Sequence, residues 1–187
     1  MPFIKAIILA STFLAASVLG FSQKPDAPDG ALFFGQNYSF ILNEPPGWSM
    51  DSETAKSQGL QAVLYPKGSS WKTAVAAMYV RVIYKNESKD TVEKVISNDI
   101  ADFLQLSKES KVSDSPTLAT RDRKAAIVKV LYDAANKNYE SVAFIDQPKV
   151  VVIVALTSRD KDEYQKSLPS FNTLVGSYFG FQPTIAR

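Results

Sequence analysis

Two places in the chain carry a serine three residues before a lysine, a spacing used in nucleophilic catalysis. Ser69 precedes Lys72, and Ser158 precedes Lys161. In such a pair the lysine amine removes the hydroxyl proton and leaves a nucleophilic oxygen. The Ser-Asp-Asn and Lys-Thr-Gly motifs that support this chemistry are absent from the sequence. We therefore interpret both pairs as residues of solvated loops and assign no catalytic residue.

Three acidic residues that lie close together, Asp160, Asp162 and Glu163, are candidates for a cation site. They lack the glycine and the ligand spacing of a calcium loop. Acidic residues also stabilise the first turn of a helix, and we favour this explanation. The sequence thus predicts no metal site and no cofactor. The basic residues within 121–124 are interpreted as a strand edge that discourages pairing, because a nucleic-acid site needs a larger basic patch.

The amino-acid composition excludes further kinds of catalysis and metal binding. The 187 residues include no cysteine and no histidine. Without thiols there are neither disulfides nor a cysteine nucleophile, and without imidazole the usual proton shuttle and the commonest zinc ligand are missing. The formal net charge is only +2, so no broad field attracts nucleic acid or anionic lipid. We predict that the protein is not an enzyme and does not bind nucleic acid.

The loop over residues 66–72 is the candidate partner-contact site. Its candidate contact residues are Lys67, Ser69, Ser70, Trp71 and Lys72. A large aromatic residue in a loop can present a contact surface, or it can fold back over the end of the core. The core placement of the tryptophan is favoured, because aromatic side chains usually bury most of their area.

The first residues have the pattern of a secretory signal peptide. Lys5 precedes an apolar run over residues 6–19. We predict a signal peptide over residues 1–22, cleaved between Gly20 and Ser22. An uncleaved anchor is the alternative, but the run is shorter than the roughly 20 apolar residues of a membrane span. The protein is therefore predicted to be secreted or periplasmic, with no stable membrane span after cleavage and a flexible, proline-containing leader over residues 23–33.

Apolar runs and alternation predict the elements that carry these residues. Strands are expected over residues 38–42, 48–50, 60–65, 77–85, 125–134, 139–146 and 149–157, the first two as one hairpin. Helical spacing of apolar residues predicts one helix over 90–108, begun by Asp90 and Glu93 as a capping box. A second helix is expected from Ser158 onward, kinked or restarted at Pro169. Residues 108–117 are polar and predict a loop.

The segment over residues 149–157 determines the expected architecture. It has no polar alternation, so as a strand it must be covered on both faces. The connections around residues 136–138 and 147–148 are short, which forces antiparallel neighbours. We predict an α+β fold in which an antiparallel sheet carries a helix on each face, as an α/β/α sandwich. It forms one domain over residues 34–181, followed by a tail over 182–187.

Several short motifs in this order resemble the PsbP-like fold. They are YSF at 38–40, PGW at 46–48, YPKG at 65–68 and SLPSF at 167–171. That fold is shared by the PsbP subunits of photosystem II, the Ran-binding Mog protein and the periplasmic DcrB protein. The chain also looks similar to small secreted bacterial proteins whose role is undetermined. The resemblance implies a non-enzymatic member of a larger assembly, and it supplies no catalytic or ligand residue.

Two functions follow as hypotheses. The first is a secreted or periplasmic accessory module that binds a protein partner in the cell envelope or outside the cell. The second is a small-ligand carrier, or an enzyme that uses carboxylates in a pocket between sheet and helix. Paired carboxylates can perform acid–base catalysis without histidine, but no such pair stands out in the sequence. The first hypothesis is favoured.

Overall fold

A computed structural model describes residues 30–85, 90–106 and 109–181 of the chain. The predicted signal peptide and most of the predicted leader lie outside the described residues. The elements are β1 (Ala31–Gly35), β2 (Tyr38–Leu42), β3 (Trp48–Asp51), α1 (Ser52–Ser57), β4 (Ala62–Pro66), β5 (Ala76–Tyr84), α2 (Val92–Leu106), β6 (Lys111–Ala119), β7 (Ala125–Asp133), β8 (Asn138–Asp146), β9 (Val150–Ser158), α3 (Lys161–Gly176) and β10 (Phe179–Phe181).

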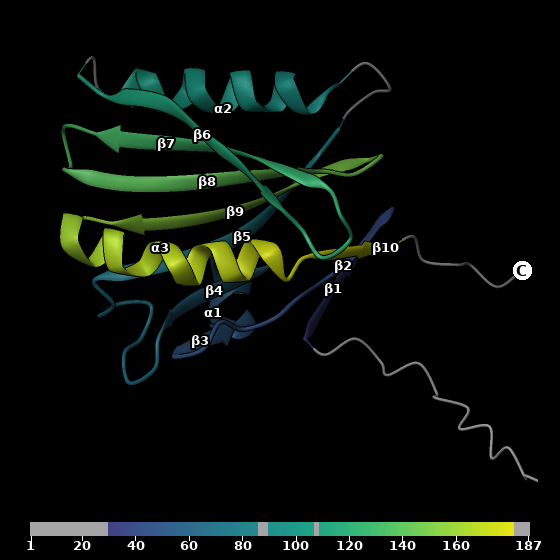
Figure 1. Ribbon diagram of the computed structural model, residues 1–187, viewed down its shortest axis with the longest axis horizontal. Coiled ribbons are helices and arrows are strands. Elements are labelled where there is room, and N and C mark those ends of the chain that lie inside the picture. Colours follow the sequence, from purple (N-terminus) through teal and green to yellow (C-terminus); the bar gives the residue numbers. More distant parts are fainter. Residues whose placement is uncertain (1–29, 86–89, 107–108, 182–187) are drawn as a thin grey trace, which may run out of the picture.

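The strands form two antiparallel sheets (Figure 1). The larger sheet has the order β3-β4-β5-β9-β8-β7-β6, and the smaller one has the order β1-β2-β10. Every described pairing is antiparallel. The predicted α+β class and the antiparallel sheet are confirmed. A single sheet with two helices was an incomplete description, because the structure adds the smaller sheet and the short helix α1.

Strand β9 is a central strand, as its apolar sequence predicts. It pairs with β5 on one side and β8 on the other, and its residues from Val150 to Leu156 have no exposed surface. Because side chains alternate along a strand, β9 contributes to two separate core clusters. Val152 and Val154 belong to one cluster, and Val151 and Ile153 belong to the other.

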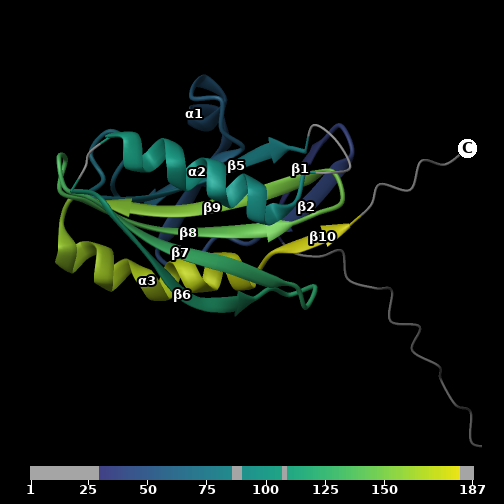
Figure 2. The same cartoon turned by 90° about the horizontal axis from the view of Figure 1, so that it is seen from above.

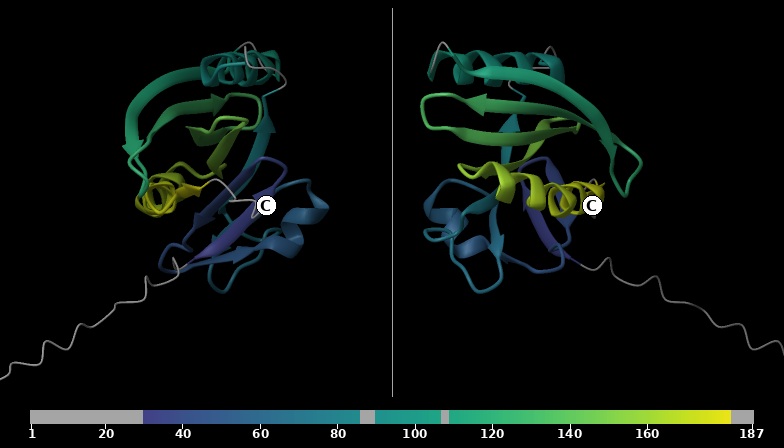
Figure 3. Two further views of the ribbon diagram at one scale, coloured as in Figure 1. Left: turned by 90° about the vertical axis from the view of Figure 1, so that its right-hand side faces the viewer. Right: turned by 60° about the vertical axis from the view of Figure 1, so that its left-hand side comes forward.

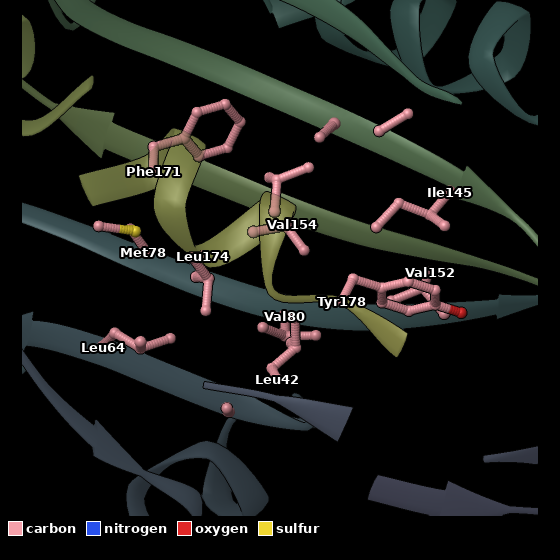
Figure 4. Packing of buried hydrophobic residues seen from close by; sticks show 14 of the residues in the cluster. Leu42, Leu64, Met78, Val80, Ile145, Val152, Val154, Phe171, Leu174 and Tyr178 are labelled. Atoms are coloured by element: carbon pink, nitrogen blue, oxygen red, sulfur yellow. The ribbon is translucent and has the colours of Figure 1, made fainter. Parts of the chain in front are cut away.

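Each cluster also contains side chains from a different helix. Helix α3 supplies Phe171 and Leu174 to the first cluster, and α2 supplies Val95 and Ile96 to the second. Figure 2 shows α2 above the strands and α3 below them. Figure 3 shows the large sheet curving until β6 comes beside α3, which β6 also contacts. Figure 4 shows the first cluster, in which side chains of α3 meet the central strands.

The smaller sheet packs on the same side as α3 through a column of aromatic rings. Phe33 stacks on Phe40, with ring centroids 5.1 Å apart, and Phe40 stacks on Tyr178 at 5.5 Å. Residue Asn37 lies in the tight β1–β2 turn with a φ of 68°, a left-handed conformation that asparagine tolerates. The aromatic column therefore joins the first hairpin of the chain to the segment after the last helix.

Three predictions about individual elements were wrong. β3 does not form a hairpin with β2, because β3 pairs with β4 and β2 pairs with β1 and β10. Residues 111–119 are not a loop but the edge strand β6, which bulges between Ser115 and Leu118. β1 begins at Ala31, within the segment predicted as a flexible leader. In each case the neighbouring strand in the sequence, β2, β4 or β7, supplies the hydrogen bonds, and the local residue pattern does not signal this pairing.

The helix ends also differ from the sequence-based expectation. Asp160, not Ser158, caps α3, and its carboxylate accepts hydrogen bonds from the amides of Asp162 and Glu163 at 2.9 Å. At α2, the Thr91 hydroxyl accepts from the Lys94 amide at 3.3 Å. A threonine cap therefore replaces the predicted capping box.

Candidate functional site

An open hollow of about 740 Å³ lies at one end of the large sheet. The β4–β5 loop, the β7–β8 turn and the β9–α3 turn meet there, because antiparallel strands bring their ends together. The lining residues are Trp71, Lys72, Ala74, Val75, Ala77, Asp133, Asn136, Asn138, Thr157, Ser158, Arg159 and Asp160. This volume lies in the range of small-molecule and peptide pockets, so the hollow is the candidate functional site.

The predicted contact loop forms one wall of this hollow. Trp71 and Lys72 line it, and both residues also line a neighbouring hollow of about 320 Å³ beside α1. Trp71 is partly buried and belongs to neither core cluster, so both its contact role and its placement over the end of the core stay predictions. By contrast, Trp48 is in the core, with only 5% of its surface exposed.

The remaining residues of the predicted contact loop shape the loop itself. The Ser69 hydroxyl donates to the Pro66 carbonyl at 2.6 Å, and the Ser70 hydroxyl lies 2.9 Å from the Thr73 hydroxyl. Lys67 pairs with Glu44 at 3.4 Å and does not line the hollow. Because the two serine hydroxyls bond within the loop, they hold its conformation and present no activated nucleophile.

The second Ser-x-x-Lys pair is likewise used for structure. The Ser158 hydroxyl donates to the Val75 carbonyl at 2.9 Å and accepts from the Asp160 amide at 3.0 Å. These bonds join β9 to the start of β5 and to the cap of α3. The bonds hold the β9–α3 turn, which lines the hollow, in place. They do not pair the Ser158 hydroxyl with the lysine that would have to remove its proton.

The hollow is lined by two charged side chains of each sign, which differ in how they are bonded within the protein. Asp133 is buried and accepts from the Asn136 side chain at 2.7 Å, a bond that, with backbone donors and the nearby Arg159 charge, lowers the pKa of Asp133. Asp160 is engaged as the cap of α3. Lys72 and Arg159 are exposed, and neither forms an ion pair with the described residues. The hollow therefore offers two cations to a ligand.

A polar network continues from the hollow along the α2 face of the sheet. The Glu140 carboxylate accepts from the Asn138 side chain at 2.7 Å and from the Thr157 hydroxyl at 3.4 Å. Further along, Arg81 of β5 donates to Asp99 of α2. Burial raises the pKa of Glu140, and the two hydrogen bonds oppose this rise only in part. Asp99 and Arg81 also act on Glu140 through their charges, in opposite directions.

Glu140→Gln is expected to stabilise the protein at neutral pH. Because the folded pKa of Glu140 lies above the unfolded value, the folded state binds more protons between the two values. The free energy of unfolding must therefore fall as pH rises through that interval, and the neutral amide removes this loss. Urea unfolding at several pH values between 4 and 8 measures the effect. An unchanged pH profile in the variant would contradict the assignment.

The other sequence-predicted sites have structural roles. Asp162 and Glu163 lie in the first turn of α3, as the helix explanation predicts. Of the basic group, Arg121 lies over the Phe179 ring at 5.8 Å. No cluster of three or more acidic, cysteine or histidine residues able to hold a metal occurs within the described ranges. The sequence reasoning missed Val75 and Arg159, because only the fold brings them beside Trp71.

The hollow belongs to an antiparallel α+β domain that solved structures share. No family model matches the sequence, and no curated protein is matched by it. The solution structure of cyanobacterial PsbP (CyanoP) from Synechocystis sp. PCC 6803 matches 87% of this chain and 99% of its own, with a TM-score of 0.50 and 12% identity. The crystal structure of LpqN, involved in cell envelope biogenesis of Mycobacterium tuberculosis, matches 77% and 83%, with a TM-score of 0.54 and 12% identity.

The chain therefore has a PsbP-like fold, as its motifs suggested. At 12% identity the likeness shows the fold and does not transfer an activity. In the part of the chain that the structure describes, no helix combines the length and the apolar character needed to cross a membrane.

Proposed function

We propose that this chain is an extracytoplasmic, non-enzymatic accessory module that binds a protein partner through the hollow beside Trp71. The proposal rests on one observation: Trp71 and the exposed Val75 lie in the same hollow as Lys72 and Arg159, which form no ion pair with any described residue. Tryptophan and arginine are the residues most enriched among those that dominate binding energy at protein interfaces. The predicted signal peptide over residues 1–22 and the single domain over 34–181 belong to this proposal.

The charged residues of the hollow indicate what kind of partner segment would bind there. Its two carboxylates accept hydrogen bonds from Asn136 and from the helix amides, whereas its two exposed cations form no ion pair among the described residues. A partner segment that carries one or more carboxylates beside an apolar side chain complements this surface. The apolar side chain contacts Trp71 and Val75, and the carboxylate lies between Lys72 and Arg159.

The alternative function is a small-ligand carrier. The volume of about 740 Å³ favours it, since drug-sized ligands occupy cavities of about 300–1,000 Å³. The open form of the hollow favours a protein surface instead, because carriers bury most of their ligand. A carboxylate-based enzyme has less support, since Glu140 and Asp99 are bonded to their own neighbours.

Trp71→Ala is expected to weaken partner binding by about 30-fold, the effect of losing a central aromatic contact. Arg159→Ala is expected to weaken it by about tenfold and to reduce its salt dependence, because a charge pair is removed. Co-purification from the native cell envelope identifies the partner, and calorimetry with that partner measures the affinities.

Leu104→Ala is the matched control, because Leu104 is exposed on α2 and does not line the hollow. The proposal requires that this variant retain the partner while the two hollow variants lose it. Equal retention by all three variants rejects the hollow as the contact site. A stoichiometric small molecule in place of a protein would establish the carrier function.

A further inference from the structure

Within the part of the chain that the structure describes, the two sheets have four edge strands, and three of these are protected against pairing with another chain. On β3 the Met50 amide donates to the Glu44 carboxylate at 2.7 Å. On β10 the Gly180 amide donates to the Asp122 carboxylate at 3.0 Å. On β6 the bulge contains Pro116, which has no amide to donate. Carboxylate caps, bulges and prolines are recognised means of preventing edge-to-edge association.

Strand β1 has none of these protections within the described residues. It contains no charged residue and no proline, and no described side chain bonds to its backbone. Its outward side chains are apolar, since Leu32 is 54% exposed and Phe34 is 74% exposed. A hollow of about 480 Å³ follows the strand, with Leu60 and Lys56 on its opposite side. An open, uncharged edge with exposed apolar side chains is a surface that pairs with another strand.

We propose that β1 pairs antiparallel with β1 of a second copy of this chain, about a two-fold axis at Phe33. In this register Leu32 of each copy lies opposite Phe34 of the other, and Ala31 lies opposite Gly35. The exposed Leu32 and Phe34 side chains therefore contact each other at two symmetry-related places in the interface. No charged residue of β1 lies opposite another, because β1 contains none. The contact is self-complementary, as a two-fold interface requires.

The hollow beside β1 is a second argument for pairing with another copy of this chain. In the proposed register the partner's Phe34 ring lies next to Leu32, which itself lines the hollow together with Leu60. The most exposed aromatic side chain of the described chain thus enters an empty space on the other copy. The two smaller sheets become one continuous sheet of twice the width, in which neither β1 edge remains open.

The size of the contact sets the expected strength. A five-residue strand pair with four apolar side chains buries less than the roughly 800 Å² per partner of a standard stable interface. We therefore expect a dissociation constant of about 10–100 µM, which corresponds to a weak dimer. This dimer is independent of the partner hollow at the other surface, so either assignment can fail alone.

Sedimentation equilibrium of the purified secreted chain, at about 5–500 µM, tests the dimer. Phe34→Lys is expected to weaken dimerisation at least about tenfold, because it places a charge in the pair. Leu104→Lys is the matched control, since Leu104 is 43% exposed on α2 and lines neither hollow. A monomer at every concentration overturns the proposal, as does a dimer that Phe34→Lys leaves intact.

The register is tested by cross-linking, because the natural chain contains no cysteine. Leu32→Cys and Phe34→Cys proteins are oxidised separately and as a mixture. The proposed register yields the mixed disulfide, with little of either symmetric one. If a symmetric disulfide dominates, the two strands pair in a different register. If the protein dimerises but forms no disulfide, β1 is not the interface. A different protein strand captured at β1 would also reject the second copy.

Discussion

Val152→Asp and Ile153→Asp are each expected to abolish folding. Both side chains lie on β9 with no exposed surface, and they face opposite core clusters. Neither face of the strand can therefore give a carboxylate access to water. Burying it without a partner costs at least about 5 kcal/mol, which equals the lower end of the stability of an average domain. The absence of a cooperative transition in thermal denaturation followed by circular dichroism measures the effect.

Val75→Asp supplies the comparison, because it adds the same charge to an exposed apolar position of the same protein. We expect its melting curve to remain close to that of the natural chain. If either β9 variant yields soluble protein with a cooperative transition, the strand is not enclosed on both faces.

Tyr178→Ala is expected to lower the free energy of unfolding by about 3–5 kcal/mol. The side chain is fully buried, its ring stacks on Phe40 at 5.5 Å, and its hydroxyl accepts a hydrogen bond from the buried Gln147 amide. The alanine removes the ring that attaches the smaller sheet and leaves the Gln147 donor without this acceptor. Urea unfolding measures the loss.

Tyr178→Phe separates the two contributions. It keeps the ring stack and removes only the hydroxyl, so the expected loss is about 1–2 kcal/mol. In the alanine variant alone, the β2 amides should also exchange with solvent faster. Equal losses in the two variants would show that the ring contributes little to docking of the smaller sheet.

The sequence was sufficient where a strand or helix has a clear apolar pattern, and it failed where a strand carries mostly polar side chains. The uninterrupted apolar run of β9 predicts a strand that is covered on both faces. The helical spacing of apolar residues in α2 predicts the side of the helix that is buried. Strand β6 carries polar side chains along most of its length, because an edge strand meets solvent, and its hydrogen bonds come from β7. Only the pairing identifies it as a strand.

The candidate site was predictable in part. The loop with Trp71 and Lys72 drew attention through its residue types, since aromatic and basic side chains between two strands are typical of contact surfaces. Its partners Asn136 and Arg159 lie far along the chain and carry no motif. Trp71 is largely buried, as aromatic side chains tend to be, but its position at the end of the sheet and outside both clusters does not follow from its residue type.

The order of the strands in the two sheets determines how much of the chain must be available before folding can finish. Strand β9 separates β5 from β8, and the amide of Asn43 donates to the Ser177 hydroxyl, 134 residues further along the chain. Neither sheet can therefore close until the last part of the chain has been synthesised. Folds dominated by such long-range pairs form slowly, because loop closure precedes the gain from contacts. The chain therefore remains incompletely folded until its last strand and helix are available, even though hairpins such as β7–β8 can pair earlier.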